Sequence, residues 1–201
     1  MERNPRRWSE WDRRHGAAGR PSPDPWLVSL APILGAGLPG PVLDLACGLG
    51  QNTLWAASLG LEAVGVDASE EALRRAREEA RRRGVPASFQ RCDLEGAGAL
   101  PVIPGGWGAV LVFRFLHRPL LRLLPDALAP GGLLAYRTHL RHPLRGEAAR
   151  PRRAAFLLEP GELLRSAAGL VPLEYREWGR AGDAWAALLA RRPGAPAPYS
   201  R

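Results

Sequence analysis

Apolar and polar positions along the chain fall into blocks that predict strands alternating with helices. Short apolar runs at 42–46, 62–66 and 87–92 predict three buried strands, and polar segments with helical spacing follow the first two. Further apolar runs at 110–113 and 133–137 predict a fourth and a fifth strand. Strands that alternate with helices form a parallel sheet covered by helices on both faces, so the pattern predicts an α/β fold.

Capping residues and prolines indicate the helix boundaries. Asp24 and Pro25 stand in the cap-then-proline order of a helix start, and Ser69 caps another helix that ends near Gly84. Pro125 interrupts a further helical segment. The predicted helices cover 25–34, 52–59, 70–83, 116–128 and 162–168.

The last two strands are expected to run antiparallel. Apolar-rich segments at 173–178 and 184–190 are joined by the short glycine-containing link 179–182. Two strands that follow each other this closely form a hairpin. The sheet is therefore expected to end in an antiparallel pair.

Length and composition place these elements in one domain. The chain has 201 residues, of which 46% are apolar, and this is enough to bury one core. Residues 1–24 are polar and predict an N-terminal arm, 25–193 form the domain, and the Pro- and Ala-rich tail 194–201 is predicted to be disordered. No apolar run of about 18 residues and no secretory leader is visible, so we expect a cytoplasmic protein without a membrane span.

The strong positive charge changes this picture little. A net charge of +8 and an isoelectric point near 11.0 are typical of proteins that bind nucleic acid. However, all 28 basic residues are arginine, a bias that GC-rich genomes produce throughout their proteins. Many arginines also stand four positions from a glutamate, as Arg74 does from Glu78, which indicates a solvated helix face. Nucleic acid stays open as a partner but is not favoured, and the basic stretch 139–153 is either a substrate lid or a solvated loop.

The segment 42–50 carries the most specific chemistry. Asp44 stands inside an apolar strand that runs into a turn with Gly48 and Gly50, where the backbone can approach a ligand closely. A dinucleotide site requires a third glycine, and that position is Thr53. Asp44 would repel a pyrophosphate, whereas it suits a ligand with an ammonium or a sulfonium group. The ligand that meets these conditions is S-adenosylmethionine.

Acids also follow the second and third strands. Asp67 ends the second strand, where a carboxylate can accept hydrogen bonds from ribose hydroxyls. Asp93 follows the third strand, where an acid can accept a hydrogen bond from the adenine amino group. Structural partners within the protein are the alternative for these acids. Three strands that each deliver a carboxylate at the carboxyl end favour ligand binding over that alternative.

Together these motifs resemble the class I S-adenosylmethionine-dependent methyltransferases. The segments 42–50, 64–69, 89–94 and 130–132 carry the resemblance. Residues 110–120 resemble a narrower branch, the small-molecule and tellurite-resistance type enzymes. The resemblance implies a Rossmann-like three-layer sandwich with a seven-stranded, mostly parallel sheet in the order 3-2-1-4-5-7-6, in which strand 7 is antiparallel.

The resemblance also implies S-adenosylmethionine as the cofactor and identifies residues that hold it. In related enzymes an N-terminal arm often folds over the cofactor as a lid; the alternative is that Trp8 and Trp11 anchor a loose arm on the body. The expected cofactor contacts are Asp44, Ala46, Gly48, Gly50, Asp67, Ala68, Asp93, Leu94 and Phe113.

The methyl acceptor is expected at the ends of the fourth and fifth strands. His117 is the candidate catalytic base there, and the alternative is that it caps the next helix. Arg114 either orients an anionic acceptor or forms an ion pair with a neighbouring acid. No Cys/His cluster has zinc spacing, so no metal is expected, and Cys47 is interpreted as a packing residue.

Three functions are compatible with these motifs. The favoured one is an enzyme (class EC 2.1.1) that transfers a methyl group to a small-molecule acceptor by in-line displacement. An RNA methyltransferase would explain the charge, but amino-directed base methylases of this fold carry an Asn/Asp-Pro-Pro-aromatic motif where residues 113–116 are Phe-Arg-Phe-Leu. The third is a non-catalytic sensor that binds the cofactor. The sequence leaves open the acceptor and whether the protein is a monomer or a homodimer.

Overall fold

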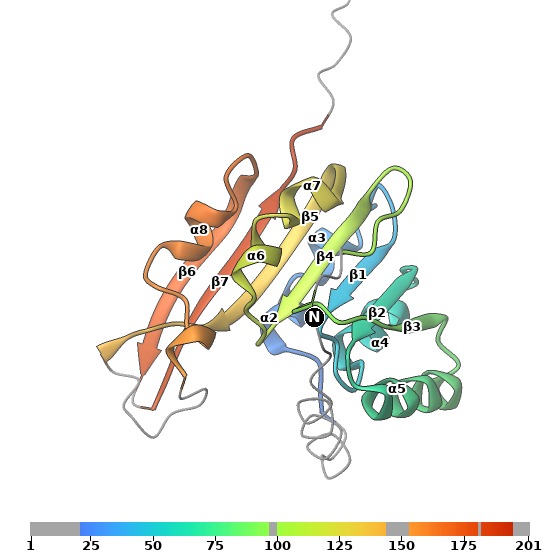
Figure 1. The fold of residues 1–201 in the computed structure, drawn as a ribbon. Helices are drawn as coiled ribbons and strands as arrows, with labels where there is room; N and C mark the ends of the chain where they lie inside the picture. Colours follow the sequence, from blue (N-terminus) through green and yellow to red (C-terminus); the bar gives the residue numbers. More distant parts are fainter. Residues whose placement is uncertain (1–20, 97–99, 144–152, 181, 195–201) are drawn as a thin grey trace, which may run out of the picture. The chain divides into compact units, whose positions relative to one another are not determined.

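Figure 1 shows the fold in a computed structural model that describes residues 21–96, 100–143, 153–180 and 182–194. A seven-stranded sheet has the strand order β3-β2-β1-β4-β5-β7-β6. The strands β1 to β3 pair in parallel, whereas β7 runs antiparallel to both of its neighbours. The predicted α/β class and strand order are confirmed. Most of the predicted N-terminal arm and nearly all of the predicted tail lie outside the described residues.

The chain divides into two compact units, which are described separately. The first unit comprises the residues up to 37 together with 41–100 and 111–113. The second comprises 38–40, 101–110 and the residues from 114 onward. The strand β4 (Trp107–Phe113) contributes to both.

The first unit holds three parallel strands and, besides two short helices near its start, two longer ones. β1 (Val42–Leu45) pairs with β2 (Ala63–Asp67), and β2 pairs with β3 (Ala87–Arg91). α4 (Gln51–Ser58) follows β1, and α5 (Glu70–Arg83) follows β2. Because the pairing is parallel, the carboxyl ends of the three strands meet at one edge of the sheet.

The helix α5 begins and ends as its sequence predicts. The side chain of Ser69 accepts a hydrogen bond from the amide of Ala72 at 3.1 Å. Glu70 and Glu71 lie in the first turn and three arginines in the last, which suits the helix dipole. Gly84 ends the helix with φ 65°, a left-handed conformation that glycine adopts without strain.

The single helix predicted after Asp24 is instead two short ones, α2 (Pro25–Ser29) and α3 (Ala31–Leu34). The reason is Pro32, which lacks an amide hydrogen and whose ring would clash with the carbonyl of Val28 in a continuous helix. The start is as predicted, because the Asp24 side chain caps α2.

Gly65 lets α4 pack directly on β2. A Cβ atom at this position would lie 2.7 Å from Oγ1 of Thr53 and 2.8 Å from the ring of Phe89. Both distances are too short for carbon, so only glycine fits between the helix and the neighbouring strand. The buried cluster around it consists of Cys47, Leu54, Leu73, Ala76, Ala80 and Phe89.

The second unit contains the antiparallel end of the sheet. β5 (Leu128–His139) pairs with β7 (Asp183–Arg191), and β7 pairs with β6 (Val171–Arg180). β5 starts earlier than the predicted 133–137, because the Pro-Gly-Gly triplet before it also bonds to the segment after β7. The amide of Gly131 donates to the carbonyl of Arg192, and the amide of Arg192 donates to the carbonyl of Gly132.

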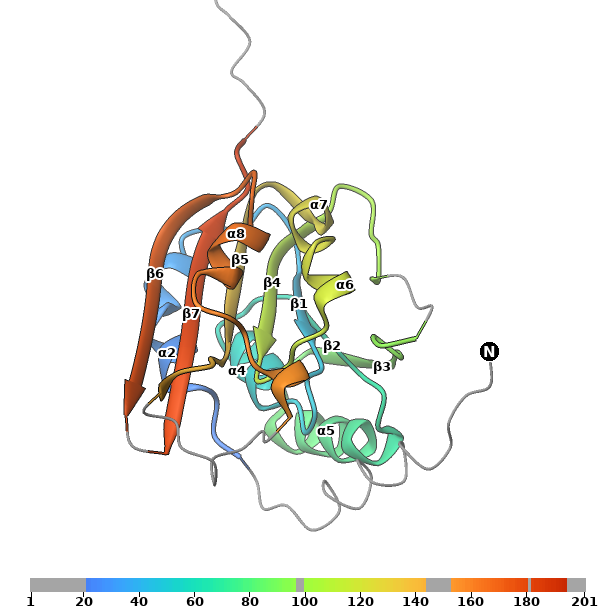
Figure 2. The same ribbon diagram turned by 60° about the vertical axis from the view of Figure 1, so that its left-hand side comes forward.

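Short helices cover one face of this part of the sheet. Figures 1 and 2 show α7 over β5 and α8 over β7 on the same side. The helical segment predicted for 116–128 is two single turns, because Pro125 cannot continue a helix that begins at Arg118. The described helices of this unit are α6 (Arg118–Leu121), α7 (Leu124–Ala127), the 3₁₀ turn η2 (Ala154–Phe156) and α8 (Glu162–Ser166).

Candidate active site

Asp44 is a carboxylate inside a fully buried strand. Its side chain accepts hydrogen bonds at Oδ2 from the amide of Thr53, at 3.0 Å, and from the Thr53 hydroxyl, at 2.6 Å. Thr53 lies in the first turn of α4, where amides have no partner within the helix. Asp44 therefore caps α4 in place of Gly50, which has no side chain. Among the described residues nothing donates to its other oxygen, Oδ1.

Burial makes the charged form of Asp44 costly. It raises the pKa of this carboxyl to about 7, the hydrogen bonds from Thr53 oppose the rise, and the charge of Asp67 adds to it. No basic side chain of the described residues forms an ion pair with Asp44. A cationic group beside Oδ1 would favour the charged carboxylate.

The turn after β1 winds through left-handed backbone. Ala46, Gly48 and Gly50 have φ angles of 54°, 54° and 73°. Glycine adopts this conformation freely, whereas alanine is strained by about 1 kcal/mol. The turn is held by the amide of Cys47, which donates to the carbonyl of Val66 on β2 at 3.0 Å. Ala46 thus stores strain at one of the positions where the sequence predicts a cofactor contact.

Asp67 ties the glycine turn to the end of β2. Its Oδ2 accepts a hydrogen bond from the amide of Gly48 at 2.8 Å, and its Oδ1 accepts one from the amide of Ser69 at 2.9 Å. Each carboxylate oxygen has two lone pairs, so both can accept a further hydrogen bond. Ala68 lies between Asp67 and Ser69 in the chain. Asp67 therefore has partners within the protein, which was the alternative to ligand binding. Its two oxygens can still accept hydrogen bonds from a ligand.

Asp93 shapes the loop after β3. Its Oδ1 accepts hydrogen bonds from the amides of Glu95, at 3.1 Å, and Gly96, at 3.0 Å. Leu94 between them is 4% exposed and belongs to the core. The amide of Cys92 donates to the carbonyl of Asp67 at 2.9 Å, so this loop starts beside the end of β2.

Phe113 ends β4 and lies against an aromatic residue that the sequence reasoning missed. Its ring centroid lies 6.0 Å from that of Trp26, with 52° between the ring planes. Phe113 is 6% exposed. Trp26 directly follows the proline that starts α2, but nothing in its sequence position indicates a contact with a residue 87 positions away.

Cys47 behaves as a packing residue. Its side chain is buried in the cluster under α4. Burial and the charges of Asp44 and Asp67 raise the pKa of the thiol well above its usual range. A thiol that stays protonated is a poor nucleophile, which agrees with the sequence interpretation.

The two predicted acceptor residues lie in the loop after β4, in the second unit. Arg114 is exposed, has φ 56°, and donates its amide to the carbonyl of Arg137 at 2.9 Å. Its guanidinium has no partner among the described residues, so the expected alternative of an ion pair is not found. His117 occupies the cap position of α6, but its side chain makes no capping bond. Its Nδ1 is buried and has no hydrogen-bond partner in the part of the chain that the structure describes.

Arg118, whose partner the sequence does not indicate, clamps this loop to the segment before α8. Its Nε and Nη2 donate to the two oxygens of Glu162 at 2.6 and 2.8 Å. Its Nη1 donates to the carbonyl of Ala155 and its Nη2 to that of Leu157, at 3.1 and 2.9 Å. Since Arg118 and Glu162 are 44 positions apart, neither residue signals the pair in the sequence.

The basic stretch 139–153 is described only at its ends. Arg141 forms an exposed ion pair with Glu159 at 2.6 Å, and the amide of Arg141 donates to the carbonyl of Leu158. Residues 144–152 lie outside the described part, so the choice between a lid and a loop stays a prediction.

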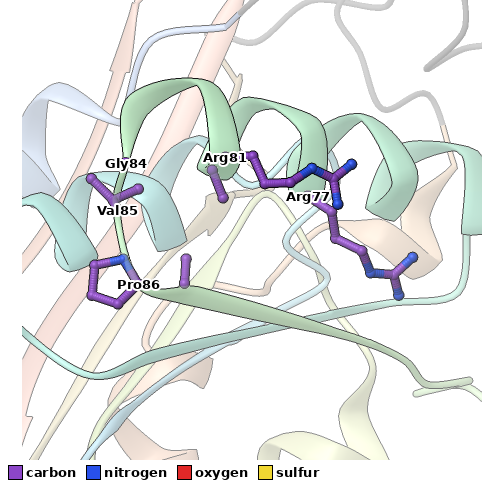
Figure 3. A pocket seen from close by; sticks show the side chains of 7 residues that line it. Arg77, Arg81, Gly84, Val85 and Pro86 are labelled. Carbon is purple, nitrogen blue, oxygen red and sulfur yellow. The ribbon is translucent and has the colours of Figure 1, made fainter.

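A shallow pocket lies elsewhere on the first unit. Figure 3 shows it between the end of α5 and the start of β3, with Arg77, Arg81 and Pro86 at its wall. The start of β3 is the opposite end of that strand from Asp93. The pocket is therefore separate from the acids at the strand ends.

The described residues lack two kinds of feature. They contain no group of three or more His, Cys, Asp or Glu side chains that could hold a metal ion. They also contain no helix with the length and apolar character that crossing a membrane requires.

Known methyltransferases resemble this chain in sequence over the part that carries the acids at the strand ends. Residues 42–132 match the family described as methyltransferase domain. The chain is 45% identical over 64 residues to the 23S rRNA (uracil(1939)-C(5))-methyltransferase RlmD of Aeromonas salmonicida, covering 31% of this chain and 15% of that protein. It is 38% identical over 91 residues to the ribosomal protein L11 methyltransferase of Thermus thermophilus, covering 45% and 35%. The chain thus spans about a third or less of the length of these curated relatives.

Among solved structures, TehB from Haemophilus influenzae has the same fold. The two superpose with a TM-score of 0.71 at 20% sequence identity. The match covers 84% of this chain and 62% of TehB. At this identity the similarity concerns the fold alone.

Proposed function

We propose that the chain is a class I S-adenosylmethionine-dependent methyltransferase that transfers a methyl group to a small-molecule acceptor by in-line displacement, because residues 42–132 match the methyltransferase-domain family. The observation that supports this most is Asp44. A carboxyl that is 1% exposed, bonded on one oxygen only and without a basic partner among the described residues is suited to a cationic ligand.

The residues of the first unit fit this cofactor. Asp44 would hold its ammonium group, the turn at 46–50 would lie along its methionine part, and Asp67 would accept from its ribose hydroxyls. Asp93 and Leu94 would meet its adenine, with Phe113 beside it. When bound, S-adenosylmethionine supplies a methyl group that is already activated by a sulfonium sulfur. The protein therefore has mainly to orient the acceptor and to take its proton.

The second unit supplies the residues proposed for the acceptor. His117 is the proposed base, because its Nδ1 is buried without a hydrogen-bond donor or acceptor among the described residues. Arg114 follows Phe113 directly in the chain, so the peptide bond keeps a proposed acceptor residue next to a proposed cofactor contact.

An RNA acceptor is the second candidate. The net charge of +8 favours it, and one curated relative is by name an rRNA methyltransferase. Against it, the residues after β4 are Phe-Arg-Phe-Leu rather than the motif of amino-directed base methylases. A sensor that binds the cofactor without turnover is the third.

Calorimetric titration with S-adenosylmethionine tests the proposed function. We expect saturable binding of one equivalent, and we expect Asp67→Ala to weaken it by about 1.5–3 kcal/mol, the range for lost charge-assisted hydrogen bonds. Arg122→Ala, at an exposed position of the second unit, is the matched control and should bind as the wild type does. No binding by folded wild-type protein would refute the proposal.

A further inference from the structure

We propose that the methyl acceptor is a small organic anion that carries a protic oxygen, nitrogen or sulfur, with Arg114 holding the anionic group and His117 receiving the proton. This inference rests on the proposed methyl transfer and names the class of its substrate. Both residues belong to the second unit and lie three positions apart in the loop after β4.

The loop that carries these two side chains is held firmly at several points. The Tyr136 hydroxyl donates to the carbonyl of Phe115 at 2.8 Å, and burial raises the pKa of Tyr136, so the hydroxyl stays a donor. The amide of Arg114 is bonded to β5, and the guanidinium of Arg118 is bonded to Glu162 and to two carbonyls. The loop is therefore pre-organised before any acceptor binds.

Arg114 is the arginine of this loop that the protein itself leaves unused. Arg118 directs four hydrogen bonds to protein acceptors, whereas the Arg114 guanidinium directs none to the described residues. Arg114 also has φ 56°, where a side chain is strained and glycine is not. A strained arginine whose head group contributes nothing to the fold is expected where that head group binds a ligand.

His117 presents the matching proton acceptor. Its Nδ1 is buried, and the described residues offer it neither a donor nor an acceptor. The cap position of α6 gives its side chain no structural bond, although its carbonyl accepts from the amide of Leu121 at 3.0 Å. A buried imidazole nitrogen without a protein partner is satisfied by a ligand that brings a proton.

The charges around this loop leave a positive excess. Two acids of the segment that Arg118 holds are paired with arginines: Glu162 with Arg118 and Glu159 with Arg141. No described acid compensates Arg114. An acceptor with an anionic group complements this charge, whereas a neutral or cationic acceptor does not.

The transfer balances with these two residues alone. The acceptor's lone pair forms a bond to the methyl carbon, the carbon–sulfur bond breaks, and its electron pair stays on sulfur. The products are the methylated acceptor and S-adenosylhomocysteine. The proton that the acceptor loses goes to the imidazole of His117, which releases it after the products have left.

Acceptor pairs that differ only in charge test the inference. We would measure S-adenosylhomocysteine formation with thioglycolate against its amide, 4-hydroxybenzoate against 4-hydroxybenzamide, and glycine against glycinamide, and with bacterial total RNA. The wild type is expected to prefer the acid of at least one pair by about tenfold or more in kcat/KM, the effect of one charge-assisted hydrogen bond. Arg114→Gly should abolish that preference through KM, and Arg114→Lys should restore part of it.

Stability and cofactor binding separate this role from a structural one. Arg114→Gly should not lower the unfolding midpoint, because glycine relieves the strain, and should leave S-adenosylmethionine affinity unchanged. His117→Gln should lower kcat. Arg122→Ala should keep the preference for acids. Arg122 is exposed, as Arg114 is, but it lies outside the loop that carries the proposed acceptor residues.

The opposite results are equally distinct. Equal rates for acids and amides, or an Arg114→Gly variant with the wild-type preference, would overturn the inference and leave the proposed function standing. Wild-type protein that binds the cofactor but methylates none of the acids would also count against it. Methylation of RNA and of none of the small acids would show that the acceptor is RNA rather than a small organic anion.

Discussion

The hydroxyl of Thr53 donates a hydrogen bond of 2.6 Å to the carboxylate of Asp44, and both side chains are buried. This bond joins the end of β1 to the start of α4 and holds one oxygen of Asp44, while the other accepts nothing from the described residues. A dinucleotide site has glycine at the position of Thr53. Here the threonine hydroxyl instead orients the carboxylate of Asp44, which can then bind a cation with its other oxygen.

Removing this hydroxyl should weaken the fold. We expect Thr53→Val to lower the free energy of unfolding by about 1–3 kcal/mol, because a buried carboxylate loses a donor. Thr53→Ser keeps the hydroxyl and is the matched control. Urea denaturation measures both, and a valine variant as stable as the wild type would show that the hydrogen bond contributes nothing.

Cofactor affinity should rise with pH. Since the pKa of Asp44 is about 7 in the folded protein, the carboxyl is largely protonated below that pH and cannot pair with an ammonium group. We expect the affinity for S-adenosylmethionine to increase between pH 5 and 8, roughly the interval on either side of that pKa, with release of a proton on binding at pH 6. Calorimetry in buffers of different ionisation enthalpy measures the proton, and Asp44→Asn should remove it.

The same group should affect stability in the opposite direction. The pKa of Asp44 in the folded protein lies above the unfolded value of about 3.9. At a pH between these two values the folded state therefore binds more protons than the unfolded state. The contribution of Asp44 to stability is then fully present below about pH 4 and is lost as the pH rises through 7. Asp44→Asn should flatten this part of the stability curve. An unchanged curve would contradict the raised pKa.

Ala46 offers a test of backbone strain. We expect Ala46→Gly to stabilise the protein by about 0.5–1 kcal/mol, because a φ of 54° is costly for alanine but not for glycine. Ala46→Val should destabilise it, since a branched side chain tolerates this conformation least. Thermal unfolding measures both. A destabilising glycine would mean that the turn is not strained.

The two ion pairs around α8 should differ in strength. The side chain of Glu162 is 17% exposed and bonded bidentately to Arg118, whereas that of Glu159 is 49% exposed. We expect Glu162→Gln to lower the free energy of unfolding by about 1–2 kcal/mol and Glu159→Gln by less than about 0.5 kcal/mol. Similar values would show that the Arg118 clamp is no stronger than a surface pair.

The sequence predicted the elements whose signals are local. The order of strands, the cap at Ser69 and the acids at three strand ends follow from neighbouring residues and from the resemblance to a family. It failed where a partner lies far along the chain. The extension of β5 through Gly131 depends on pairing with Arg192, and the use of Arg118 depends on Glu162.

The candidate site divides in the same way. The sequence predicts Asp44, inside one apolar run, and Asp67, at the end of another, as ligand groups, but it does not indicate their structural bonds to Thr53 and Gly48. Those bonds depend on how a turn folds back, which residue spacing does not specify. The strain at Arg114 is likewise a property of backbone angles alone.

A crystal structure with bound S-adenosylhomocysteine tests the central claim most directly. We predict its ammonium group within hydrogen-bond distance of Oδ1 of Asp44, its ribose hydroxyls on Asp67 and its adenine beside Leu94. Density for the ligand away from these residues, for example in the pocket beside Arg81, would contradict the account.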